Sequence, residues 1–102
     1  MLLPLLLGAA LAMSPEDAQV ILQIEAQRLP PLALAQYVSS DDPPTRARAA
    51  RALGRLRSAS SLAPLKRLVA DDDLYVRAEA AFALGQTPGS GRALLDALEG
   101  QV

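Results

Sequence analysis

Five arginines between residues 46 and 57 are the side chains of this sequence best suited to bind another molecule. A guanidinium group presents several N–H donors in one plane and forms paired hydrogen bonds with carboxylates and phosphates. Arg48, Arg51 and Arg55 are spaced three and four residues apart, so they share one face of a helix. This face is suited to a carboxylate of another protein or to the phosphates of a nucleic acid.

The sequence lacks the side chains that most often perform catalysis. It contains no histidine and no cysteine, which removes the commonest general base, the thiol nucleophile and any disulfide. Asp71, Asp72 and Asp73 are consecutive, whereas the ligands of known calcium loops alternate, so capping of a helix explains them better than a cation site. We therefore expect no enzyme activity, no cofactor and no metal.

The overall charge argues against nucleic acid as the partner. Ten Lys and Arg residues stand against eleven Asp and Glu residues, and the net charge of −1 provides no long-range attraction to phosphate. Nucleic-acid binding through Arg48, Arg51 and Arg55 remains an alternative. We instead expect the partner to be another protein, and the sequence does not reveal its identity.

A repeated motif indicates the elements that carry these arginines. Residues 42–54 read D-P-P-T-R-A-R-A-A-R-A-L-G, and residues 73–85 read D-L-Y-V-R-A-E-A-A-F-A-L-G. Self-similarity at a period of 31 residues is typical of stacked helical arrays. No segment alternates with a period of two, so we predict an all-α protein without strands.

The repeat extends the arginine face into a six-residue contact strip. Its members are the three arginines and the residues 31 positions later: Arg48, Arg51, Arg55, Glu79, Phe82 and Gln86. Phe82 is the only phenylalanine, and an exposed aromatic side chain beside arginine is typical of protein interfaces. The alternative is that Phe82 packs on a neighbouring helix and that the arginines are ordinary solvated charges.

Helix signals divide the chain into a capping helix and a repeat array. Residues 13–30 should form the capping helix, with Val20, Ile21, Ile24 and Leu29 facing the core. Residues 31–102 should form about two and a half units, each a short helix followed by a longer one. The predicted helices cover about 15–29, 32–39, 43–56, 62–70, 74–86 and 92–99.

The sequence from Asp73 to Gly85, D-x-x-V-R-x-x-A-A-x-A-L-G, resembles the second helix of a HEAT repeat. It is most similar to the short bacterial subtype that is also found in phycobilin lyases, over about residues 31–99. The resemblance implies an α-solenoid of stacked antiparallel helix pairs whose second helices line a concave surface. It also implies that Arg46 and Arg77 bond acidic-turn oxygens. In the first unit, Thr45 stands where an apolar residue is expected.

Several packing expectations follow from the repeat. Thr45, Ala49 and Leu53, like Val76, Ala80 and Leu84, should face the paired short helix. Gly54 and Gly85 should either cap a helix or permit a tight crossing. The last unit holds Leu94, Leu95 and Leu98 without a following long helix. We expect either a fragment of a longer array or an open apolar edge that stacks on another copy or on a partner.

Residues 1–12 form an apolar run that is too short to span a bilayer as a helix. Its length, and Ala10-Leu11-Ala12 at its end, predict a cleaved signal peptide and export to the periplasm or the extracellular space of a bacterium. No lysine or arginine precedes the run. If Met13 is the true start, the protein is instead cytoplasmic.

The sequence therefore predicts a non-catalytic scaffold of HEAT-like repeats that binds a partner protein along its second-helix face. The alternatives are a nucleic-acid-binding repeat protein and an accessory subunit of a lyase-type enzyme.

Overall fold

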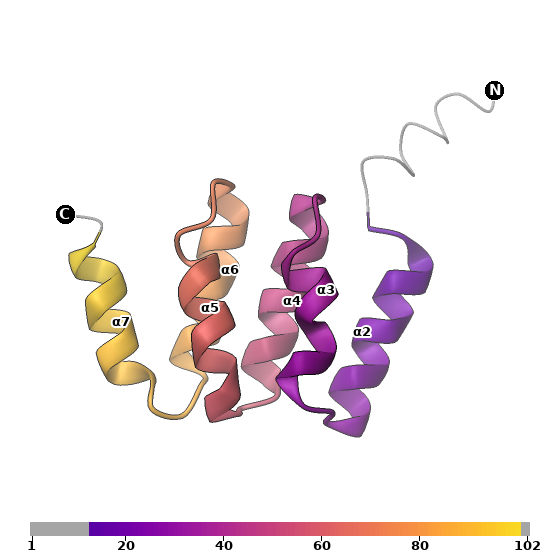
Figure 1. The fold of residues 1–102 in the computed structure, drawn as a ribbon, viewed down its shortest axis with the longest axis horizontal. Coiled ribbons are helices and arrows are strands. Elements are labelled where there is room, and N and C mark those ends of the chain that lie inside the picture. The colour runs from indigo at the N-terminus through magenta and orange to yellow at the C-terminus, as the bar shows by residue number, and fades with distance from the viewer. Residues whose placement is uncertain (1–12, 101–102) are drawn as a thin grey trace.

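Every regular element in the part of the chain that the structure describes, residues 13–100 of a computed structural model, is helical. The elements are listed here in chain order (Figure 1): α2 (Pro15–Gln27), the 3-10 turn η1 (Pro31–Leu34), α3 (Ala35–Val38), α4 (Pro43–Arg55), the 3-10 turn η2 (Ala59–Ser61), α5 (Leu62–Leu68), α6 (Leu74–Gly85) and α7 (Ser90–Glu99). The all-α prediction is confirmed. The predicted signal peptide, residues 1–12, lies outside the described residues.

The helices form two layers. The short helices α3 and α5 lie in front of the long helices α4 and α6 in Figure 1, and each short helix runs antiparallel to the long helix that follows it. The helix α2 packs beside α4, and α7 packs beside α6 and α5. The resulting body is flat, with extents of 51 × 35 × 16 Å. This arrangement is the predicted α-solenoid of stacked helix pairs.

Short polar side chains begin the three longest helices. The side chain of Ser14 accepts a hydrogen bond from the backbone N–H of Asp17, and Asp42 accepts one from Thr45. Asp73 accepts one from the N–H of Val76 at 3.0 Å. These caps satisfy amides that have no partner within the first turn. They explain why the predicted starts of these helices agree with the structure.

The predicted core of the repeats is buried. Leu53 and Leu84 are fully enclosed, as are Val76, Ala80 and Ala49. The short helices contribute Leu34, Tyr37, Val38, Leu65, Leu68 and Val69. Thr45 is also buried, and its hydroxyl donates to Asp42 Oδ2 at 2.6 Å. This bond allows a polar residue to occupy the apolar position of the motif.

Two core assignments in the capping helix are wrong. The helix α2 buries a stripe through Ile21 and Ile24, and Val20 lies beside this stripe with 40% of its surface exposed. Arg28 adopts a left-handed conformation with φ 51° and ends α2 before Leu29, which is therefore turned outward. A helix that packs on one neighbour needs only a narrow apolar stripe, so Val20 is not required in the core.

The two glycines of the motif have different surroundings. A Cβ atom added to Gly54 would lie 2.8 Å from the Cα of Ala83, so Gly54 permits the close crossing of α4 and α6. Around Gly85 the same added atom would meet nothing within 4 Å. Gly85 is the last residue of α6 and has no left-handed conformation. Neither expected role applies to it.

The C-terminal helix α7 begins at Ser90, two residues earlier than predicted. Leu95 is exposed, whereas the side chains of Leu94 and Leu98 lie outside the described part of the structure. Among the described residues, no helix combines the length and the apolar character needed to cross a membrane.

Candidate functional site

Arg46 and Arg77 both bond oxygens of the acidic turns, as the resemblance implies. Arg46 donates from Nε and Nη2 to the carboxylate of Asp71 in the next unit, at 2.8 and 2.9 Å. It also donates from Nη1 to the carbonyl oxygen of Ser40 at 2.9 Å. The bond from Arg77 Nη1 to the carbonyl oxygen of Asp71, at 2.8 Å, is the equivalent contact one repeat later. Arg46 thus links two adjoining units, Arg77 bonds within its own unit, and both leave the contact strip to other residues.

The three consecutive acids Asp71, Asp72 and Asp73 also take part in contacts within the array. Asp73 caps α6, and Asp71 accepts a hydrogen bond from the backbone N–H of Asp73 at 2.9 Å in addition to those from Arg46. Asp72 points into solvent with a single contact to Arg46 at 3.3 Å. The predicted capping is confirmed at Asp73, whereas Asp72 is solvated.

Replacing Asp71 with asparagine tests the Arg46–Asp71 pair. Hydrogen bonds from Arg46 hold the pKa of the Asp71 carboxyl below its ordinary value. The pair therefore stabilises the fold fully above the pKa of an unfolded aspartate, and this stability is lost progressively as the pH falls from there through the lowered pKa of Asp71. We expect Asp71→Asn to lower the free energy of unfolding by about 2 kcal/mol at pH 7 and by much less at pH 3. Urea denaturation at both pH values measures the difference, and Asp72→Asn, which alters an exposed carboxylate, is the matched control.

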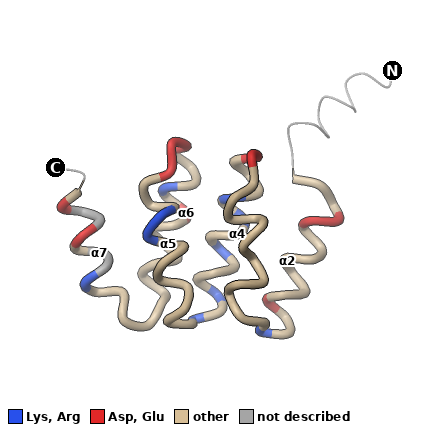
Figure 2. Tube along the Cα trace, in the orientation of Figure 1, with Lys and Arg blue, Asp and Glu red and all other residues tan. Residues whose placement is uncertain are grey.

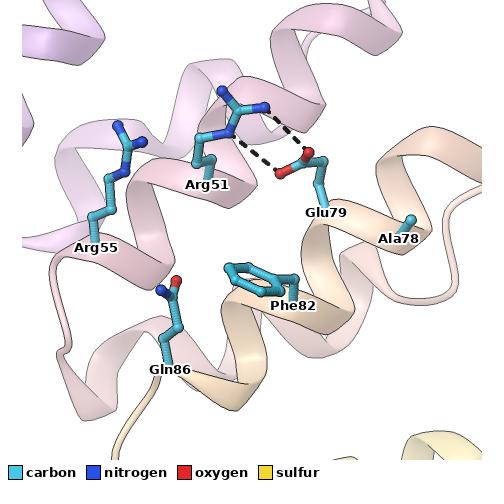
Figure 3. A pocket seen from close by; sticks show the side chains of 6 residues that line it. All are labelled: Arg51, Arg55, Ala78, Glu79, Phe82 and Gln86. Carbon is cyan, nitrogen blue, oxygen red and sulfur yellow. Dashed lines mark hydrogen bonds and ion pairs between the residues drawn. The ribbon is translucent and has the colours of Figure 1, made fainter.

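The contact strip is crossed by an ion pair between the two long helices. Arg51 of α4 donates from Nη2 to Glu79 Oε1 of α6 at 3.1 Å and from Nε to Oε2 at 3.3 Å (Figure 3). It also donates to the hydroxyl of Tyr75 at 3.3 Å. The hydrogen bonds from Arg51 lower the pKa of Glu79, and the pKa of Arg51 is raised in turn. Both groups stay charged near neutral pH.

The other two arginines of the strip share one carboxylate on the capping helix. Arg48 Nη1 contacts Glu25 Oε1, and Arg55 Nη1 contacts Glu25 Oε2 at 3.3 Å. The side chain of Arg48 is only 17% exposed, whereas that of Arg55 is 53% exposed. Arg48 therefore turns toward α2 and away from the remainder of the strip. Sequence reasoning missed Glu25 because α2 lies outside the repeat and has no counterpart within it.

A groove of about 430 Å³ lies between α4 and α6, and we call it the α4–α6 groove. Five of the six predicted strip residues line it, together with Ala78: Arg51, Arg55, Glu79, Phe82 and Gln86. Figure 3 shows these side chains arranged around the hollow. Phe82 is 71% exposed, so it does not pack under a neighbouring helix as the alternative required.

Two further apolar side chains near the start of α6 were not singled out from the sequence. Leu74 and Tyr75 are exposed, and Tyr75, Ala78 and Phe82 are spaced so that they share one face of the helix. This spacing was visible in the sequence. Figure 2 shows basic residues along α4 and acidic residues in the turns before α4 and α6. The exposed face of α6 thus adds apolar surface beside the charged face of α4.

The antiparallel helix pairs, the repeated arginine contacts and the groove between the second helices define an α-solenoid. A family model described as HEAT repeats matches residues 30–102, which is more than half of the sequence. The chain belongs to the HEAT-repeat family. Neither a curated protein nor a solved structure matches it. HEAT repeats generally mediate protein–protein interactions and are typically non-catalytic scaffolds.

Proposed function

We propose that this chain is a non-catalytic scaffold that binds a partner protein in the α4–α6 groove. The observation that carries the proposal is the exposed ring of Phe82 in a groove bordered by Arg51 and Arg55. Aromatic and arginine side chains are enriched among the residues that contribute most to binding at protein interfaces. A groove of this size accommodates one or two side chains of a partner.

The charge state of the groove supports binding in preference to proton-transfer chemistry. A general acid or base is most effective when its pKa lies near the operating pH. Glu79 has a lowered pKa because of its bonds with Arg51, so it remains a carboxylate at neutral pH. Its role in the proposal is to hold Arg51 across the groove.

The nucleic-acid alternative is weaker because the arginines are already engaged. Arg48 is mostly enclosed with Glu25, and Arg51 is paired with Glu79. Each phosphate neutralised by a free cation adds to the affinity and to its salt dependence, so a face with paired arginines gains little from phosphate. Retention of duplex DNA at low salt would support this alternative. No observation on the described residues favours the accessory-subunit alternative.

The double variant Arg51→Ala and Phe82→Ala tests the proposed groove. We expect it to weaken capture of the partner by at least about tenfold, because it removes both the charged and the aromatic anchor. The measurement is quantitative mass spectrometry of proteins retained by the immobilised chain in extracts of its own host. Circular dichroism must show that helicity is unchanged.

A matched control removes one arginine and one exposed apolar side chain from the other layer. Leu32 and Arg67 line a smaller cavity of about 220 Å³ beside the short helices. Replacing both with alanine should leave capture unchanged. Equal losses in the two double variants, or no loss in either, would contradict binding in the α4–α6 groove.

Two other expectations remain proposals. Export of the chain after removal of residues 1–12 is supported by the apolar run and its Ala10-Leu11-Ala12 ending, and the intact mass of the protein isolated from its host tests it. Self-association near α7 is supported by the exposed Leu95, and sedimentation velocity at micromolar concentration tests it.

A further inference from the structure

The arginines of the contact strip outnumber the carboxylates that pair with them. Among the residues that the structure describes, Arg48, Arg51 and Arg55 pair with two glutamates, Glu25 and Glu79. These three arginines therefore carry one positive charge more than the two glutamates that pair with them neutralise, although the whole chain is slightly acidic. A local surplus of this kind attracts a ligand of opposite charge to one place on the surface.

The surplus is located at Arg55. Glu25 is largely enclosed and already contacts Arg48, which is itself mostly covered. Arg55 reaches the second oxygen of the same carboxylate at 3.3 Å and keeps half of its side chain exposed. Such an exposed contact contributes little to stability. An incoming carboxylate can therefore bind Arg55 without breaking a pair on which the fold depends.

An apolar wall adjoins this cation. Phe82 and Ala78 line the same groove as Arg55, and Gln86 lies between Arg55 and Phe82 in the view of Figure 3. The exposed phenyl ring offers a surface that an apolar side chain would cover. Gln86 offers an amide that can donate or accept a hydrogen bond. A molecule bound in the groove can therefore place a negative group against Arg55 and an apolar group against the ring of Phe82.

The geometry points to a partner segment that carries a carboxylate next to an apolar side chain, with the carboxylate on Arg55 and the apolar group on Phe82. This inference rests on the proposed function, because it names the chemistry of the partner at the same groove. A basic segment would meet the surplus positive charge. A purely acidic segment would leave the phenyl ring in water.

A peptide selection on the full chain tests the inference. Random short peptides displayed on phage are selected on the immobilised protein, and the enriched peptides are synthesised and titrated by fluorescence anisotropy. We expect the enriched peptides to place an aspartate, a glutamate or a terminal carboxylate beside an apolar residue. Arg55→Ala should weaken their binding about tenfold, and Arg55→Lys should weaken it less. Arg67→Ala removes the same charge on the short-helix layer and should change nothing.

A double-mutant cycle assigns the contact to one pair of groups. Replacing the peptide carboxylate with an amide should weaken binding to the unaltered chain as much as Arg55→Ala does. The two changes together should weaken binding little more than either change alone. Peptides that depend on Phe82 but not on a carboxylate or Arg55 would overturn the inference while the proposed function stands. Peptides unaffected by Phe82→Ala, or no enrichment at all, would count against both. Displacement of the peptides by duplex DNA would overturn the inference in favour of phosphate.

Discussion

Replacing Leu53 with alanine is expected to lower the free energy of unfolding by about 3 kcal/mol. Leu53 is fully enclosed and belongs to the buried face of α4. Alanine would leave a cavity that the close-packed helices fill only in part. Because a small domain has a free energy of unfolding of only about 5–15 kcal/mol, the loss is a large share of its stability.

Urea denaturation followed by circular dichroism measures this effect. The matched control is Leu32→Ala, because Leu32 is 82% exposed and the same truncation there removes little buried surface. The control should change the free energy of unfolding by less than about 0.5 kcal/mol. Equal midpoints for the two variants would show that Leu53 is not in the core, and the register of the repeat would then be wrong.

Opposite effects are expected when alanine replaces the two equivalent glycines of the motif. Helix propensity alone favours alanine over glycine by about 1 kcal/mol. At Gly54 this gain is outweighed, because the new Cβ would lie 2.8 Å from both the Cα and the Cβ of Ala83. Backbone atoms cannot rotate away, so α4 and α6 would have to separate. We expect Gly54→Ala to cost about 2 kcal/mol.

Gly85→Ala is the internal control for this prediction. An added Cβ there meets nothing within 4 Å, and the residue is helical, so alanine should stabilise the fold by up to about 1 kcal/mol. Thermal and urea unfolding of the two variants show directly whether each substitution raises or lowers the free energy of unfolding. Two changes of the same sign would contradict the close crossing of α4 and α6 at Gly54.

The Gly54 crossing also bears on function. Arg51 and Glu79 meet across the same pair of helices, so the spacing that Gly54 permits sets the width of the α4–α6 groove. A variant that separates the helices should therefore weaken partner binding as well as stability. Gly85→Ala should leave binding unchanged.

Much of the fold could be predicted from the 31-residue repeat. A repeat shows which positions keep their residue type, and such positions in a stacked array are those that meet neighbouring units. Leu53 and Leu84 were placed correctly for this reason. The bonds of Arg46 and Arg77 to acidic-turn oxygens followed instead from the resemblance to HEAT repeats. The acidic run that includes Asp73 was recognised as a helix cap because capping depends on local chemistry alone.

The remaining features depend on contacts that a repeat cannot reveal. Gly54 and Gly85 are identical in the motif, but only Gly54 has a long helix packed against it. The partner of Arg48 is Glu25, which belongs to the non-repeating helix α2. Val20 was placed in the core because the apolar stripe of α2 was taken to be wider than a single packing contact requires.

Five of the six strip residues come together in the groove because spacing on one helix face follows from helix geometry. Arg48 departs from the groove because an ion pair redirects a long, flexible side chain. Helical spacing determines the helix face on which such a side chain begins, whereas the opposite charges within reach determine the position of its guanidinium group.

Site-specific photo-crosslinking tests the central claim most directly. A photoreactive phenylalanine analogue is introduced in place of Phe82 in one variant and in place of Leu32 in another, and both are expressed in the native host. Both side chains are exposed, but Phe82 lies in the α4–α6 groove and Leu32 lies on the short-helix layer. We predict a crosslinked partner protein from position 82 and none from position 32. Crosslinks from position 32 alone would contradict a scaffold that holds its partner between its long helices.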